Sequence, residues 1–133
     1  MKQIFFILTV MMSFQFASAH GVHDSGGVKP QKGGVIQSLE TIHVEFVNIG
    51  KEIFIYVFNK DNPPKPLDTK DYPVSAKVIL PRKGGEEKVN LEAKESHWVA
   101  KYDPKGLHRY TFELTIEQGG HTDHLKFTVE PKK

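Results

Sequence analysis

Residues 109–130 read RYTFELTIEQGGHTDHLKFTVE, two alternating segments joined by a Gly-Gly pair. Apolar side chains occupy every second position on both sides of the pair, as Tyr110, Phe112, Leu114 and Ile116, then Leu125, Phe127 and Val129. A period of two is typical of a β-strand with one face in a core and one in water. Gly119-Gly120 supplies the positive φ angles that a tight hairpin turn needs. The stretch therefore predicts an antiparallel hairpin that lends one face to a hydrophobic core.

A similar strand-and-turn pattern extends back to Gly33, because short β-branched and aromatic runs alternate there with turn residues. No stretch of ten or more residues carries a helical apolar stripe. Besides the hairpin strands Arg109–Glu117 and Thr122–Glu130, strands are predicted at Val35–Leu39, Thr41–Asn48, Glu52–Asn59, Ser75–Leu80, Glu87–Ala93 and His97–Tyr102. This pattern predicts an all-β, immunoglobulin-like antiparallel β-sandwich of seven or eight strands.

The faces of three strands can be assigned from the alternation. In Thr41–Asn48, we expect His43 and Glu45 on the surface, opposite the core residues Ile42, Val44 and Phe46. The run Ile53–Phe58 is apolar on both faces, which predicts a central strand or one with a loop over its outer face. His97 should lie outside the core that takes up Trp98, Ala100 and Tyr102.

Residues 1–19 have the pattern of a cleavable export signal. Lys2 precedes an apolar run from Ile4 to Phe16, and Ala17-Ser18-Ala19 offers the small side chains that signal peptidase requires. A helix of that run would reach roughly 20 Å, short of the ~30 Å needed to span a bilayer. We therefore expect a periplasmic protein that begins at His20 and has no membrane anchor after cleavage.

Composition narrows the function classes. Removing 19 of 133 residues leaves 114, enough for a leader at residues 20–32, expected to be flexible, and one sandwich domain at residues 33–133. The chain has no cysteine, which excludes disulfides, thiolate metal sites and a cysteine-linked lipid anchor. Basic and acidic residues nearly balance and are interspersed, so no nucleic-acid partner is expected.

Seven histidines are the unusual feature, and all follow the signal. Neutral imidazole is the commonest protein ligand for copper, zinc and nickel. Four of the histidines form two H-x-x-H pairs, His20/His23 and His121/His124, and these are the predicted metal ligands. His43, His97 and His108 are more simply surface or turn residues.

His20 becomes the strongest ligand if cleavage follows Ala19. Its free α-amino group and ring could chelate one metal, and His23 could complete a planar three-nitrogen site for copper(II). Cleavage one residue later would leave Gly21-Val22-His23, which binds copper(II) or nickel(II) through backbone amides. The plain alternative is a polar leader in which the histidines have no role.

His121 and His124 follow the Gly-Gly turn. Residues three apart on a strand point to opposite faces, so only the turn end of the hairpin could bring both to one ion, or His121 together with Asp123. Exposed hairpin residues without a ligand are the plain alternative.

No enzyme signature is present. The chain lacks H-E-x-x-H, G-x-S-x-G and a phosphate-binding glycine loop before a helix. We therefore expect a non-catalytic protein.

The layout of several motifs resembles known domains. A His-containing leader, the Gly33-Gly34 entry, the strand with His43-x-Glu45 and the later Lys65-Pro66 are similar to N-terminal domains associated with heavy-metal (cation) efflux membrane-fusion proteins. The stretch Trp98–Gly106 and the closing strands resemble YtkA-like and FixH-like domains. The resemblance implies an immunoglobulin-like fold in a setting of metal export, with no ligand set of its own.

The sequence thus favours a periplasmic metal-binding or efflux accessory protein, whose partners are a metal ion and an efflux-system or envelope protein. The first alternative is an immunoglobulin-like interaction module without a metal role, which docks by an edge strand or by the proline-rich loop 62–73. A copper-dependent enzyme with an N-terminal histidine is a minor alternative, similar in that one feature to lytic polysaccharide monooxygenases. CopC-type copper proteins, which are β-sandwiches of similar size to the domain predicted here, are a further minor alternative.

Overall fold

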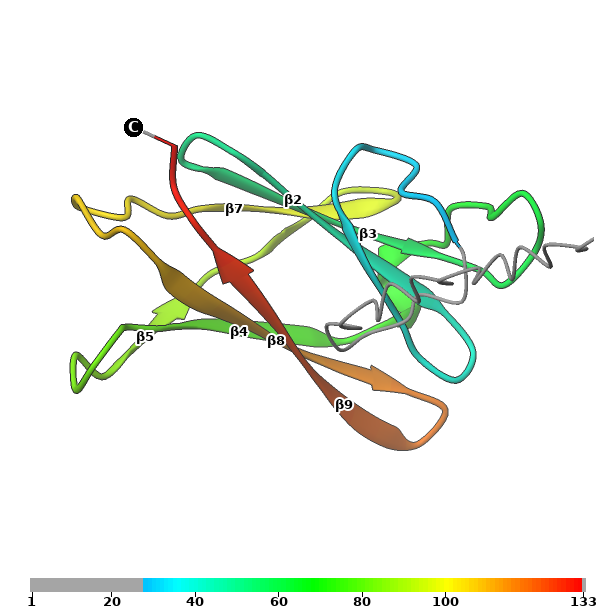
Figure 1. Cartoon of the computed structure of the whole chain (residues 1–133). Coiled ribbons are helices and arrows are strands. Elements are labelled where there is room, and N and C mark those ends of the chain that lie inside the picture. Colours follow the sequence, from blue (N-terminus) through cyan, green and yellow to red (C-terminus); the bar gives the residue numbers. More distant parts are fainter. Residues whose placement is uncertain (1–27, 133) are drawn as a thin grey trace, which may run out of the picture.

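The computed structural model describes residues 28–132, which form two antiparallel sheets packed face to face (Figure 1). One sheet has the order β1 (Val35–Ser38), β2 (His43–Ile49), β3 (Glu52–Phe58), β7 (His97–Lys101) and β6 (Glu92–Ala93). The other has the order β5 (Glu86–Val89), β4 (Val74–Ile79), β8 (Tyr110–Gln118) and β9 (His121–Val129). The predicted antiparallel sandwich is confirmed.

The core lies between the sheets and is built from the alternating apolar rows. Phe46 of the five-stranded sheet reaches the opposite layer, where its ring centroid lies 5.1 Å from that of Phe112 and 4.7 Å from that of Phe127. Offset and tilted ring pairs at this separation stabilise a core beyond the area that they bury. Trp98, Ala100 and Tyr102 are buried in the same cluster, as their alternation predicts.

The predicted hairpin forms from β8 and β9, with its turn at Gly119-Gly120. Tyr110 lies opposite Val129 at one end, and Gln118 lies opposite His121 at the turn. Gly119 and Gly120 have φ angles of 53° and 83°, the left-handed region in which glycine is favoured. β3 lies between β2 and β7, which confirms the central position predicted for Ile53–Phe58.

The single strand predicted at Glu87–Ala93 is wrong, because the chain changes sheets within it. Val89 pairs with Ala76 in the four-stranded sheet, whereas Ala93 pairs with Trp98 in the five-stranded sheet. Asn90 and Leu91 make the crossing between β5 and β6. For this reason the described residues contain nine strands and not seven or eight.

The connection from β3 to β4 holds a short 3-10 helix, η1 (Thr69–Asp71). Asp68 caps it, since its Oδ1 accepts the backbone N–H of Lys70 at 3.0 Å. Within residues 28–132 no helix is long and apolar enough to cross a membrane.

The surface positions predicted for His43 and Glu45 are wrong, because the outer face of the five-stranded sheet is covered at these two residues. Glu45 is 0% exposed and His43 is 5% exposed. The Glu45 carboxylate accepts the backbone N–H groups of Gln31 at 2.9 Å, Lys32 at 2.7 Å and Gly34 at 2.9 Å. Three donors satisfy the buried carboxylate, so residues 31–34 act as a cover that replaces water.

Gly34 is required for this cover. A Cβ atom at that position would lie 2.2 Å from the carbonyl oxygen of Phe46. Lys32 adds a contact on the same face, because its Nζ lies 5.4 Å from the centroid of the Tyr56 ring, and Tyr56 is the direct neighbour of Glu45 across the sheet. The Gly-Gly entry and the buried glutamate are thus two halves of one packing arrangement.

Candidate metal centre

The predicted metal ligands fall into two groups. His20 and His23 lie outside the described residues. His121 and His124 both lie near the start of β9, directly after the Gly119-Gly120 turn. Of the four predicted ligands, His121 and His124 are therefore the two whose positions the structure describes.

The structure groups His121 with Asp123 and places His124 on the other face of β9. His121 Nε2 lies 3.3 Å from Asp123 Oδ2. His124 Nδ1 instead lies 3.0 Å from Oγ1 of Thr115, its direct neighbour across the hairpin. Successive side chains of a strand alternate between faces, so residues 121 and 123 share a face that residue 124 does not.

Hydrogen bonds hold the Asp123 carboxylate in place. Gln118 Nε2 donates to Asp123 Oδ2 at 2.7 Å, and Thr41 Oγ1 donates to Gln118 Oε1 at 2.6 Å. Gln118 is 5% exposed, and Thr41 lies in the turn between β1 and β2. The chain Thr41–Gln118–Asp123–His121 therefore links the two sheets at the end of the sandwich.

The Asp123 carboxylate can still accept further hydrogen bonds or bind a ligand. Its Oδ1 accepts no hydrogen bond from residues 28–132, and its side chain is 31% exposed. The His121 side chain is 47% exposed. Both groups can therefore be reached from solvent while one carboxylate oxygen is fixed by protein.

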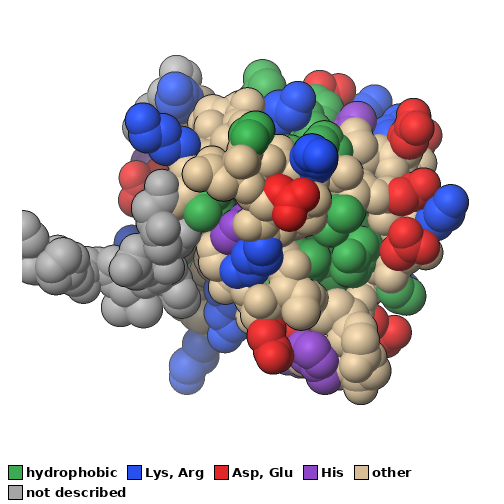
Figure 2. All heavy atoms as spheres, turned by 90° about the vertical axis from the view of Figure 1, so that its right-hand side faces the viewer, with side chains coloured by type: hydrophobic (Ala, Val, Ile, Leu, Met, Phe, Trp, Pro, Cys, Tyr) green, Lys and Arg blue, Asp and Glu red, His purple; other side chains and the backbone are tan. Residues whose placement is uncertain are grey.

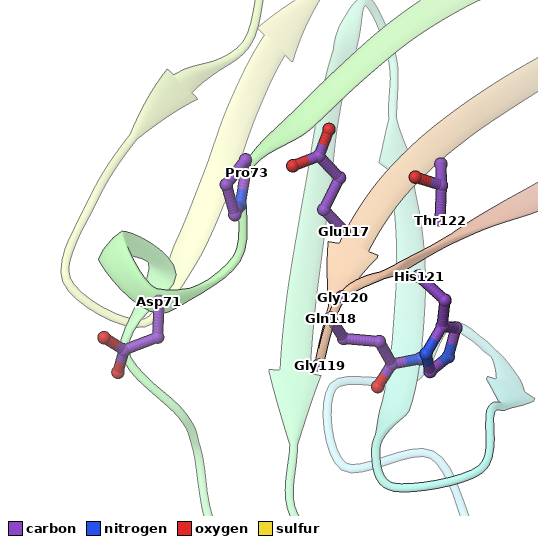
Figure 3. Close-up of a pocket in the computed structure, with 8 residues that line it drawn as sticks. All are labelled: Asp71, Pro73, Glu117, Gln118, Gly119, Gly120, His121 and Thr122. Carbon is purple, nitrogen blue, oxygen red and sulfur yellow. The ribbon is translucent and has the colours of Figure 1, made fainter.

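Figure 3 shows a hollow beside His121, between the hairpin turn and η1. The His121 ring lies next to the Gln118 amide, whereas the Asp71 and Glu117 carboxylates point away from it (Figure 3). The other lining residues are Pro73, Gly119, Gly120 and Thr122. The hollow offers room for a small ligand such as water beside His121.

A full set of three metal ligands is absent from the described part of the chain. Figure 2 shows this end of the sandwich, where histidine side chains appear at separate places and acidic and basic groups are mixed. The hairpin pair therefore supplies two candidate ligands, and a metal bound there would need water to complete its coordination.

The remaining histidines have structural surroundings. His43 Nδ1 lies 2.7 Å from Ser38 Oγ, and burial followed by the charge of Lys60 lowers the pKa of His43. The His97 ring stacks on Tyr56 with centroids 5.0 Å apart, and burial followed by the charges of two lysines, Lys94 and Lys32, lowers its pKa. Both shifts favour neutral rings packed on the sheet. His108 is exposed in the loop before β8.

Sequence reasoning missed Gln118 and Thr41. A signal for Gln118 was present, since it continues the inward row of Tyr110, Phe112, Leu114 and Ile116 by one further period of two. A polar residue at an inward position needs a partner, and here the partners are Thr41 and Asp123. No local sequence pattern predicts the role of Thr41, because it lies 77 residues from Gln118 in the sequence.

Comparison of the chain with family models, curated proteins and solved structures gives no match in any of the three. The likeness to domains of heavy-metal efflux systems therefore stays a prediction that rests on sequence motifs alone.

Proposed function

We propose that this chain is a periplasmic, non-catalytic protein that binds a divalent transition metal and serves metal homeostasis or efflux. The observation that carries the proposal is the hairpin pair, in which His121 Nε2 and Asp123 Oδ2 lie 3.3 Å apart on one solvent-accessible face. Imidazole nitrogen with carboxylate oxygen is a donor set suited to zinc, copper and nickel.

Histidine content supports the same function. The chain has seven histidines and no cysteine, so nitrogen and oxygen donors are the ligands it can offer. His20 and His23 would form a second ligand set if the exported chain begins at His20, with the α-amino group as an additional donor. The likeness to efflux-associated domains suggests an efflux-system or envelope protein as the partner that receives or delivers the ion.

The interaction-module alternative has weaker support from the strand edges. Binding by strand addition needs an open edge, and β9 is an edge strand of nine residues. Gln37 Nε2 donates to the backbone carbonyl of Lys126 at 2.7 Å, so a side chain from β1 already takes one acceptor in the middle of β9. Short strands, β1, β5 and β6, form the other sheet edges.

Calorimetric titration of the exported chain with zinc(II), copper(II) and nickel(II) tests the proposal. We expect at least one metal to bind with a Kd below about 10 µM, equivalent to roughly 7 kcal/mol. Binding weaker than this for all three metals contradicts the proposal. A pull-down from envelope extract with and without chelator separates the two functions, because an interaction module would recover the same partner in both.

A further inference from the structure

We infer that His121 and Asp123 form a chelating pair for a tetrahedral zinc-type ion, with Gln118 as the residue that positions the carboxylate. The inference rests on the proposed function and adds which two side chains bind, in which geometry, and what holds them. It replaces the H-x-x-H pairing of His121 with His124 at this hairpin.

The separation of the donor atoms favours a tetrahedral ion. Two ligands about 2.0–2.2 Å from zinc and about 109° apart are separated by about 3.4 Å. Two ligands at about 2.0 Å that meet at 90° in a planar copper(II) site are separated by about 2.8 Å. The observed separation between His121 Nε2 and Asp123 Oδ2 is 3.3 Å, close to the tetrahedral value.

The hydrogen bond on Asp123 is of the kind expected at a carboxylate that binds a metal. Carboxylates that bind metals are held by a further hydrogen bond that fixes their orientation. Gln118 gives Asp123 such a bond at 2.7 Å, and Gln118 is itself buried and held by Thr41. Asp123 therefore offers an oriented oxygen, while its Oδ1 is left without a hydrogen bond from any residue that the structure describes.

An alternating strand explains why this pair and not the sequence motif would bind. His121 and Asp123 are two positions apart on β9, and their side chains project from the same face beyond the last core residue, Leu125. His124 faces Thr115 across the other face of the hairpin. Water would complete the coordination.

Zinc titration of the exported chain, followed by calorimetry, compares two site variants with a matched control. His121→Ala and Asp123→Asn each remove one donor and should raise the zinc Kd at least about 10-fold. His124→Ala removes the same side chain type from the same strand and should leave the zinc Kd unchanged. Circular dichroism melting of each variant confirms that it is folded before the titration.

Cobalt(II) reports the geometry directly, because tetrahedral cobalt(II) absorbs visible light far more strongly than octahedral cobalt(II). The exported chain and His124→Ala should show the intense tetrahedral bands, and His121→Ala should not. Gln118→Met, which keeps the shape and loses the amide, should weaken and shift these bands and raise the zinc Kd about 10-fold. A purely structural role of Gln118 would lower the melting temperature without changing the cobalt spectrum.

The outcomes separate this inference from the proposed function. Metal binding that is unaffected in His121→Ala and Asp123→Asn but lost in a His20→Ala/His23→Ala double variant overturns the hairpin site and leaves the proposed function standing. If His124→Ala loses zinc binding and Asp123→Asn keeps it, the H-x-x-H pairing is restored and the inference is overturned. Absence of binding by every metal overturns both.

Discussion

Glu45 and Gly34 are joined by a hydrogen bond of 2.9 Å from the Gly34 backbone N–H to Glu45 Oε1, and the Glu45 side chain is closed to water. The same oxygen accepts the Lys32 N–H, and Oε2 accepts that of Gln31. A buried carboxyl group in this position depends on the backbone N–H groups that cover it. Two predictions follow from this pairing.

Glu45→Gln should destabilise the fold by about 1–3 kcal/mol, because the amide group places donors against backbone donors. Amide hydrogen exchange of residues 31, 32 and 34 should accelerate at the same time. Urea unfolding and exchange mass spectrometry measure the two effects. Glu52→Gln, at the exposed start of β3, is the control and should change the free energy of unfolding by less than about 0.5 kcal/mol. Equal stability of the two variants would contradict the claim that the hydrogen bonds from residues 31–34 to Glu45 stabilise the fold.

Gly34→Ala should cost about 1–3 kcal/mol, because its Cβ would meet the backbone oxygen of Phe46 at 2.2 Å and backbone cannot give way easily. Gly33 next to it has a φ of 75° and no atom within 4 Å of a built Cβ. Gly33→Asn should therefore be nearly neutral, since asparagine tolerates the left-handed region. Denaturant midpoints compare the two variants, and the prediction is wrong if Gly33→Asn is the more damaging change.

Phe46→Ala should cost about 3–5 kcal/mol, since it removes the ring that contacts Phe112 and Phe127 across the two layers. Val35 lies directly opposite Phe46 on the neighbouring strand but is 58% exposed. Val35→Ala should therefore change the free energy of unfolding by no more than about 0.5 kcal/mol. Thermal and urea unfolding of both variants check the contrast.

The fold should lose stability as the pH falls below about 6.5. His43 and His97 have pKa values lowered from the ordinary value of 6.5, mainly by burial. The unfolded chain therefore binds protons on these rings at a higher pH than the folded chain does, and the free energy of unfolding decreases as the pH falls through this range. Above about pH 7.5 both states are neutral at these positions and the contribution levels off.

His43→Asn should reduce this slope, because it removes one of the two shifted groups and keeps a hydrogen-bonding side chain near Ser38. The measurement is the urea midpoint at a series of pH values from 5 to 8. His108→Asn, at an exposed histidine, is the control and should keep the slope of the unmodified chain. A pH dependence unchanged in His43→Asn would show that this ring titrates normally in the folded state.

Period-two alternation was sufficient to predict most of the fold. The strands of the β8–β9 hairpin, the central place of β3 and the burial of Trp98 all follow from which side chains are apolar. The sheet change between Val89 and Ala93 could not be read in this way, because the alternation runs on through Asn90 and Leu91 while the backbone turns to another partner.

The burial of Glu45 escaped prediction for a different reason. Alternation assigns a charged residue to water, and the groups that replace water here are backbone N–H donors, which every sequence possesses. At the candidate site, alternation already separated His121 from His124 and allowed His121 with Asp123. The support from Gln118 and Thr41 needed the two sheets to be brought together first.

The hydrogen-bond chain at the hairpin has a consequence for how occupancy of the site could be detected. Any shift of the Asp123 carboxylate must be followed by the Gln118 amide, and Oε1 of that amide holds the Thr41 hydroxyl at 2.6 Å on the opposite sheet. An ion bound at His121 and Asp123, as proposed above, would thereby be coupled to the turn between β1 and β2 without touching it. The chemical shift of the Thr41 backbone amide should therefore change when a metal binds at the hairpin. A partner protein that contacts this turn could in the same way distinguish the metal-bound chain from the metal-free one.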